Sequence, residues 1–191
     1  MRFEALKKYF LRRLEKQLSP KLTYHGIHHT LDVLNVCEDY ITRYKLSTGD
    51  AELLLVGAVL HDSGFLETYK AHEEKGVQLA ESTMPYFEYT EKEIEVVSGL
   101  IMATKVPQQP TTLLEKIICD ADLDYLGRSD FYEIGETLFI ELQHFIGLTD
   151  RTEWNKIQIK FLTGHEYHTD WAREVRAPVK NNYIEEIKML V

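Results

Sequence analysis

Apolar residues recur at intervals of three and four along almost the whole chain, and no other feature limits its fold as strongly. In the N-terminal segment these positions are Phe3, Leu6, Phe10, Leu14 and Leu18. Such spacing places side chains on one face of an α-helix, and Ser19 and Pro20 end that helix. No run alternates between apolar and polar residues for long enough to require a strand. The chain is therefore predicted to be all-α.

Capping signals and the same spacing predict the later helices. Thr90 with Glu93, and Thr112 with Glu115, have the pattern of a capping box at a helix start. Residues 51–60 (AELLLVGAVL) are apolar nearly all round, as expected of a buried, central helix. The expected helices after the first cover residues 28–44, 49–61, 71–82, 90–104, 112–126, 129–147, 150–163 and 170–191.

Length and composition fit one domain, and the charge limits the partners. The chain has 191 residues, 44% hydrophobic and 28% charged, as in ordinary globular proteins. We expect a single domain over residues 1–191. The formal net charge is -9. So negative a chain lacks the basic surface that binds phosphate backbones, which argues against nucleic acid polymers and, more weakly, against anionic membranes.

No segment has the features of a membrane span or of a signal peptide. No stretch approaches the ~18 apolar residues of a membrane-spanning helix. The N-terminal MRFEALKKYFLRRLEKQL is rich in charge and lacks the apolar centre of a signal peptide. Cys37 and Cys119 are too few for a disulfide framework, and free thiols are typical of a reducing compartment. A cytoplasmic location is therefore expected.

Histidine and aspartate gather in three segments. YHGIHHT (24–30) holds three histidines, LHDSG (60–64) holds a His-Asp pair at the end of the apolar helix, and CDADLD (119–124) holds three aspartates. These helical segments can converge inside a bundle, where metal sites are built from facing helices. Imidazole and carboxylate suit borderline and hard divalent ions, and burying two aspartates without a cation would be costly. A divalent metal site is therefore predicted.

In the order His…His-Asp…Asp, the three segments resemble the signature of the HD superfamily of metal-dependent phosphohydrolases. LIMATKVPQQP (100–110), ICDADLDYLG (118–127) and FLTGHEYHTDWAREVRAPVKNNY (161–183) resemble a bacterial branch of predicted HD phosphohydrolases. The resemblance implies a single HD-type helical bundle. Its motif core would cover about residues 24–127, and additional C-terminal helices would cover about residues 128–191.

The resemblance also implies the metal ligands. They are His29, His61, Asp62 and Asp122. Asp122 is chosen because ADL (121–123) matches the family's last element, but Asp120 and Asp124 stay open as alternatives. Those two aspartates are four apart and share a helix face, opposite Asp122. Two histidines and two aspartates are compatible with manganese, magnesium, nickel, cobalt, iron or zinc, with one or two ions per site.

His25 and Asp62 are the candidate catalytic residues. Related cyclic-nucleotide phosphodiesterases have a His-x-x-x-His pattern whose first histidine protonates the leaving oxygen, and His25 lies four before His29. Imidazole suits that role near neutral pH. Asp62 would ligate the ion, and would bridge two ions or orient the water. Cyclic nucleotides are only one option, because those enzymes are much larger and carry a purine-clamping glutamine that has no matched counterpart.

His72, Lys105 and Arg128 are weaker candidates for substrate binding. His72 follows the His-Asp pair, where similar proteins carry polar residues near the metal pocket and some HD members use a further histidine for a second ion. Lys105 and Arg128 could hold a substrate phosphate. Each residue also fits an ordinary structural role, such as Lys105 as a cation at a helix C-terminus.

The sequence favours a hydrolase of a small phosphorylated molecule, such as a nucleotide or another phosphomonoester or phosphodiester. A divalent ion would polarise the phosphoryl group and activate water, and His25 would protonate the leaving group. One alternative is a non-catalytic module that binds a metal and a nucleotide, because fold does not imply function. Another is a di-iron oxygenase of HD type, for which His72 is the only clear spare histidine. The oligomeric state is left open, a homodimer included.

Overall fold

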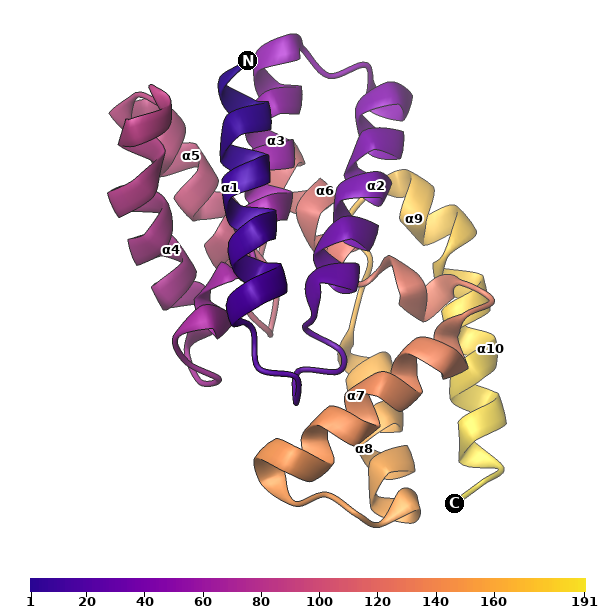
Figure 1. Cartoon of the computed structure of the whole chain (residues 1–191). Helices are drawn as coiled ribbons and strands as arrows, with labels where there is room; N and C mark the ends of the chain where they lie inside the picture. Colours follow the sequence, from indigo (N-terminus) through magenta and orange to yellow (C-terminus); the bar gives the residue numbers. More distant parts are fainter.

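The computed structural model describes residues 1–191, and it contains helices and no strand (Figure 1). The all-α prediction is confirmed. The α-helices are α1 (Arg2–Gln17), α2 (Ile27–Tyr44), α3 (Thr48–Leu60), α4 (His72–Thr83), α5 (Glu91–Ala103), α6 (Leu113–Asp122), α7 (Phe131–Ile146), α8 (Arg151–Gly164), α9 (Asp170–Val175) and α10 (Ala177–Lys188). The short 3-10 turns are η1 (Ser63–Leu66), η2 (Met84–Phe87) and η3 (Asp124–Gly127).

Local signals set most helix ends. Both predicted capping boxes are present, at Thr90 before α5 and at Thr112 before α6. Two predicted helices were too long. The helix expected over 112–126 stops at Asp122 and is followed by η3. The helix expected over 170–191 is divided at Arg176, because a proline in the next turn is tolerated only at the start of a new helix.

Two hydrophobic cores hold the helices together. The first joins α1 to α6, and α3 lies at its centre with most of its second half fully buried. The second joins the chain after α6 to α7, α8 and α10. Figure 1 shows the N-terminal helices (indigo to magenta) on one side and the C-terminal helices (orange to yellow) on the other. Trp171 packs against both cores and so connects them.

The packing of α2 brings the histidine and aspartate segments together. α2 lies against both α3 and α6. The start of α2, the end of α3 and the end of α6 meet at the same end of this helix group. α7 and α8 lie on that side of the molecule in Figure 1. The three motif segments therefore face the C-terminal helices across a shared interior.

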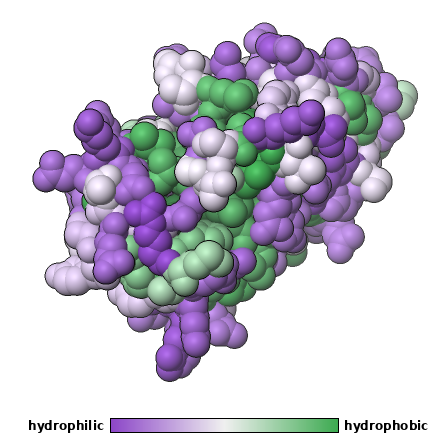
Figure 2. Space-filling view, turned by 90° about the horizontal axis from the view of Figure 1, so that it is seen from above, coloured by the Kyte–Doolittle hydropathy of each residue, from purple (hydrophilic) through white to green (hydrophobic).

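The surface mixes hydrophilic and hydrophobic groups. On the face seen in Figure 2, a band of hydrophobic side chains is framed by hydrophilic ones, as is normal for a folded domain. None of the helices combines the length and the apolar character that crossing a membrane requires.

Candidate metal centre

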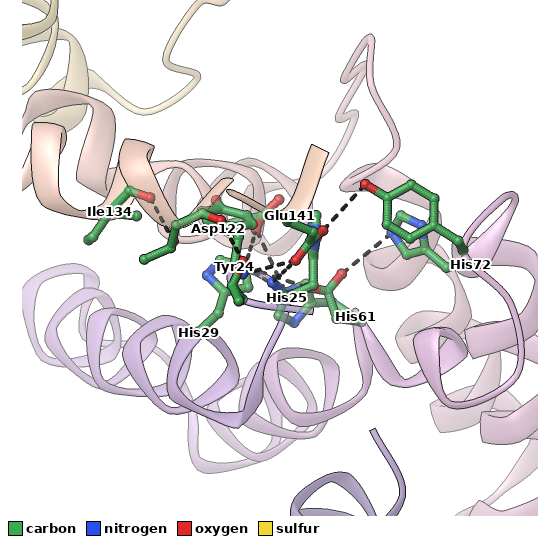
Figure 3. A network of polar contacts seen from close by, with 12 residues as sticks. Tyr24, His25, His29, His61, His72, Asp122, Ile134 and Glu141 are labelled. Atoms are coloured by element: carbon green, nitrogen blue, oxygen red, sulfur yellow. Dashed lines mark hydrogen bonds and ion pairs between the residues drawn. The ribbon is translucent and has the colours of Figure 1, made fainter. Parts of the chain in front are cut away.

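His29, His61 and Asp122 lie close together (Figure 3), and Asp62 follows His61 directly in the chain. The Nε2 atom of His29, in the first turn of α2, lies 3.0 Å from Asp122 Oδ1 and 3.3 Å from Nε2 of His61. Asp62 Oδ2 lies 3.2 Å from His61 Nε2 and 3.6 Å from His29 Nε2. The ligand atoms of His29, His61 and Asp122 all lie within 4.8 Å of one another, a spacing that could hold one cation, and Asp62 Oδ2 lies beside both histidine rings. The structure thus brings together the four residues that the sequence suggested as ligands.

The end of α3 explains how two adjacent residues face the same point. On a continuous helix, neighbours such as His61 and Asp62 would point about 100° apart. Here α3 ends at Leu60, and the chain turns after His61. The Nδ1 atom of His61 donates to the carbonyl oxygen of Ala58 at 2.9 Å. This bond fixes the ring and leaves Nε2 available as a ligand atom.

Gly64 allows α4 to start close to the centre. Gly64 lies inside η1, which directly follows the end of α3. A Cβ atom there would lie 1.8 Å from the carbonyl oxygen of His72. Because the side chain is absent, His72 packs close by, with Nε2 3.4 Å from Asp62 Oδ1 and its ring stacked on Phe65.

Replacing Gly64 with alanine is expected to destabilise the protein by about 1–3 kcal/mol or more, because the added methyl group overpacks a backbone contact. Urea denaturation measures the effect. Gly99→Ala is the matched control, since a Cβ there would meet only Glu115 Oε1 at 3.5 Å. Equal stability of the two variants would show that the contact at Gly64 does not constrain the start of α4.

Burial and charge fit a divalent cation. His29, His61 and Asp62 are buried, and Asp62 Oδ2 has no hydrogen-bond partner although it is inaccessible to solvent. An uncompensated buried carboxylate is costly. Without a cation, a proton compensates: burial disfavours the charged ring of His61, but Asp62 and Asp122 raise its pKa to about 9. A divalent ion would take the place of that proton.

The other two aspartates of the CDADLD segment face the C-terminal helices. Asp120 accepts hydrogen bonds from the backbone N–H groups of His168 and Thr169 at 2.7 and 2.8 Å. Asp124 accepts two hydrogen bonds from the guanidinium group of Arg176 at 2.7 and 3.0 Å. Burial raises the pKa of Asp120 to about 6, although these hydrogen bonds oppose the shift. Both carboxylates are thus occupied by structural contacts away from the metal centre.

Replacing Asp120 with alanine is expected to lower stability by about 2 kcal/mol or more, because two backbone N–H groups lose their acceptor. Metal content should stay at the wild-type level. Urea denaturation and elemental analysis check the two results. Asp170→Ala, which removes an exposed ion pair with Arg173, serves as the control and should cost less than about 1 kcal/mol. If the folded Asp120→Ala protein lost its metal, Asp120 would have to be a metal ligand.

Glu141 is a site residue that the sequence did not point out. Its Oε2 accepts the backbone N–H groups of Tyr24 and His25 at 2.9 and 3.0 Å, and its Oε1 lies 2.5 Å from His25 Nδ1. Glu141 is fully buried. The sequence does contain one signal for Glu141. This acidic residue stands three positions after Leu138, on the apolar face of a helix, where a charged side chain is unusual. α7 thereby holds the loop before α2 against the centre.

A cavity of about 520 Å³ opens onto the centre. His25, Asp62, His72 and Asp122 line one end of it, together with Lys105. The Lys105 ammonium is partly exposed and pairs with Glu74.

Arg128, the third candidate for substrate binding, does not line this cavity. Its guanidinium group lies 3.0 Å from Asp32 and 2.8 Å from Asp130. The structure therefore brings His72 and Lys105 to the cavity but places Arg128 in a separate ion-pair network.

Comparison with known proteins supports the resemblance seen in the sequence. The family model of the HD domain matches residues 26–124, which is just over half of the chain. All four candidate ligands lie within the matched region. Comparison with curated proteins and with solved structures gave no match. Because the match covers most of the first core and every element of the centre, the chain belongs to the HD domain family.

Proposed function

We propose that the protein is a metal-dependent phosphohydrolase that cleaves a small phosphorylated molecule, such as a nucleotide or another phosphomonoester or phosphodiester. The observation that supports it best is the convergence of four ligand-type side chains, with an unpartnered carboxylate oxygen, at the end of a cavity. The residues that would hold the ion are His29, His61, Asp62 and Asp122. A bound divalent ion of manganese, magnesium, nickel, cobalt, iron or zinc would polarise the phosphoryl group and activate water for attack.

The two carboxylate oxygens of Asp62 can have different roles. Its Oδ2 faces the rings of His29 and His61, whereas its Oδ1 lies 3.4 Å from His72 Nε2. One oxygen is thus positioned as a ligand, and the other can accept a hydrogen bond from the attacking water. This division of roles makes Asp62 the candidate that orients the nucleophile.

His25 is placed to protonate the leaving oxygen. It lines the cavity, and its Nδ1 is engaged by Glu141, which leaves Nε2 for the substrate. Burial disfavours the charged ring, but the hydrogen bond with Glu141 and the nearby carboxylate of Asp62 raise the pKa of His25 above its ordinary value. This shift favours the protonated ring, which is the form that a general acid needs.

Phosphate release from a panel of esters tests this function. The protein is stripped of metal, reloaded with one divalent ion at a time, and assayed with phosphomonoesters, nucleotides and cyclic nucleotides. We expect hydrolysis that requires the ion and stops when a chelator is added. A protein that binds the ion tightly but releases no phosphate from any ester would instead be a binding module.

A second candidate function follows from His72. Its position beside Asp62 Oδ1 would suit a second ion, as a di-iron oxygenase of HD type requires. Elemental analysis and an absorption spectrum of the iron-loaded protein separate the two functions. Two irons per chain with a charge-transfer band, and no phosphate release, would favour the oxygenase.

A further inference from the structure

The cavity extends from the metal centre between α7 and α8, and its far part is apolar. The side chains that form this part, here called the apolar chamber, are Leu126, Leu138, Leu142, Trp154, Ile157 and Phe161. The amide of Gln158 also lines the cavity there. All the ionisable groups that line it, apart from tyrosine hydroxyls, come from the segments around the centre. The cavity is therefore polar at one end and hydrocarbon-like at the other.

The whole cavity, from the metal centre to the apolar chamber, is too large to serve the phosphate group alone. A volume of about 520 Å³ lies within the range of about 300–1,000 Å³ found for sites that bury a drug-sized ligand. Val106, Leu123, Ile157 and Phe161 also line a second cavity of about 480 Å³. The two spaces adjoin through these apolar side chains, but the second is lined mainly by polar and charged groups such as Lys160, His165 and His168. An apolar body is therefore assigned to the first cavity.

The charges at the polar end limit the number of phosphates. The carboxylates of Asp62, Glu73 and Asp122 line the cavity, whereas Lys105 is the only lysine or arginine that does so. Lys105 is already paired with Glu74. A single phosphate can be neutralised by the ion and by His25, but further phosphates would face carboxylates without a matching cation. This end suits a monophosphate.

The chemistry of the chamber limits the body of the substrate. Each hydroxyl or amide that is buried without a partner carries a free-energy penalty, and the chamber offers few partners beyond Gln158. A sugar or a nucleoside would bury many polar groups there. A hydrocarbon body would gain affinity with each methylene group that leaves water.

We propose that the substrate is the monophosphate ester of an apolar alcohol, with its phosphate at the metal centre and its hydrocarbon body in the apolar chamber. The inference rests on the proposed function. In the reaction, the oxygen of water bonds to phosphorus and the bond from phosphorus to the ester oxygen breaks. The leaving alcohol takes a proton from His25, and the products are the alcohol and inorganic phosphate.

A series of n-alkyl monophosphates from methyl to octyl tests the assignment directly. Until the chamber is filled, the KM should fall about threefold to fourfold with each added methylene. The reason is that burying one methylene group contributes about 0.8 kcal/mol to binding. Octyl phosphate should then exceed adenosine monophosphate, glycerol phosphate and adenosine diphosphate in kcat/KM. Equal or better kcat/KM for any of these three polar esters would overturn the proposal.

A polar substitution inside the chamber supplies a matched comparison. Leu142→Gln should raise the KM for octyl phosphate at least about tenfold, because an amide replaces hydrocarbon in the pocket. The KM for methyl phosphate should change much less. Ile140→Gln, on an exposed position of the same helix, is the control and should leave both values near wild type. If Leu142→Gln raised the KM for both esters by the same factor, the hydrocarbon body would not lie in the chamber.

Binding of 1-octanol separates this inference from the proposed function. Calorimetry with the metal-free protein should show binding that Leu142→Gln weakens and Ile140→Gln preserves. If octanol binds but no ester is hydrolysed, the chamber is supported and the proposed reaction fails. If esters are hydrolysed but octanol does not bind, the hydrolase stands and the apolar substrate is ruled out.

Discussion

Replacing His61 with alanine is expected to abolish metal binding and, with it, the hydrolysis of phosphate esters. His61 is fully buried, and its Nε2 lies within 3.3 Å of His29 Nε2 and 3.2 Å of Asp62 Oδ2. Loss of a residue that merely supports a ligand typically costs about 10–100-fold in metal affinity. Loss of the ligand itself should therefore cost more than about 100-fold. Titration calorimetry with manganese measures the affinity.

His28→Ala is the matched control for this variant. His28 lies one position before His29 in α2, is exposed, and is not part of the converging group. It should bind manganese and hydrolyse esters as the wild type does. Circular dichroism shows whether His61→Ala still folds. A folded His61→Ala protein with wild-type metal affinity would remove His61 from the centre.

Replacing His25 with glutamine is expected to lower kcat by about 10²–10⁴-fold, which is the usual contribution of general acid-base catalysis. The amide of glutamine has no acidic proton to give to the leaving oxygen near neutral pH. Metal content should be unchanged, because His25 contacts Glu141 rather than the converging ligand atoms. Steady-state kinetics and elemental analysis of the same preparation provide both values. An unchanged kcat would assign the proton transfer to another group.

The pH dependence should carry the signature of the His25–Glu141 pair. Burial lowers the pKa of His25, but Glu141 and Asp62 raise it by more than burial lowers it. The net shift is therefore upward from 6.5. The rate should therefore decline as pH rises through this raised value, because the acid loses its proton. Glu141→Gln removes a carboxylate that raises the pKa, so the alkaline decline should begin at lower pH. Identical profiles for wild type and Glu141→Gln would contradict this role.

The same pair has a predictable effect on stability. A histidine with a raised pKa in the folded state contributes stability that is complete below its unfolded pKa of about 6.5. That contribution disappears as pH rises through the higher, folded-state pKa. Denaturation of wild type and His25→Gln across this window should therefore show a difference that shrinks with increasing pH. A difference that grew with pH would have the wrong sign.

Local patterns in the sequence predicted the helices and the three motif segments well. The capping boxes at Thr90 and Thr112 depend only on residues three apart, so they could be read directly. The face shared by Asp120 and Asp124 could be predicted as well. What these aspartates bind could not, because their partners Thr169 and Arg176 lie about fifty residues further along the chain.

Features that depend on the packing of distant helices were missed. Glu141 binds the backbone of Tyr24 and His25 across more than a hundred residues, and no local pattern specifies that contact. The apolar chamber has the same origin, because the side chains of α7 and α8 have the spacing of ordinary core residues. The close approach of the His72 carbonyl oxygen to Gly64 is likewise visible only in three dimensions.

Anomalous diffraction from crystals grown with manganese tests the central claim most directly. We expect one strong peak within about 2.3 Å of a ligand atom from each of His29, His61, Asp62 and Asp122. A second, weaker peak beside Asp62 and His72 would also be consistent with it. A manganese peak elsewhere, with these four side chains bonded only to protein or water, would contradict it.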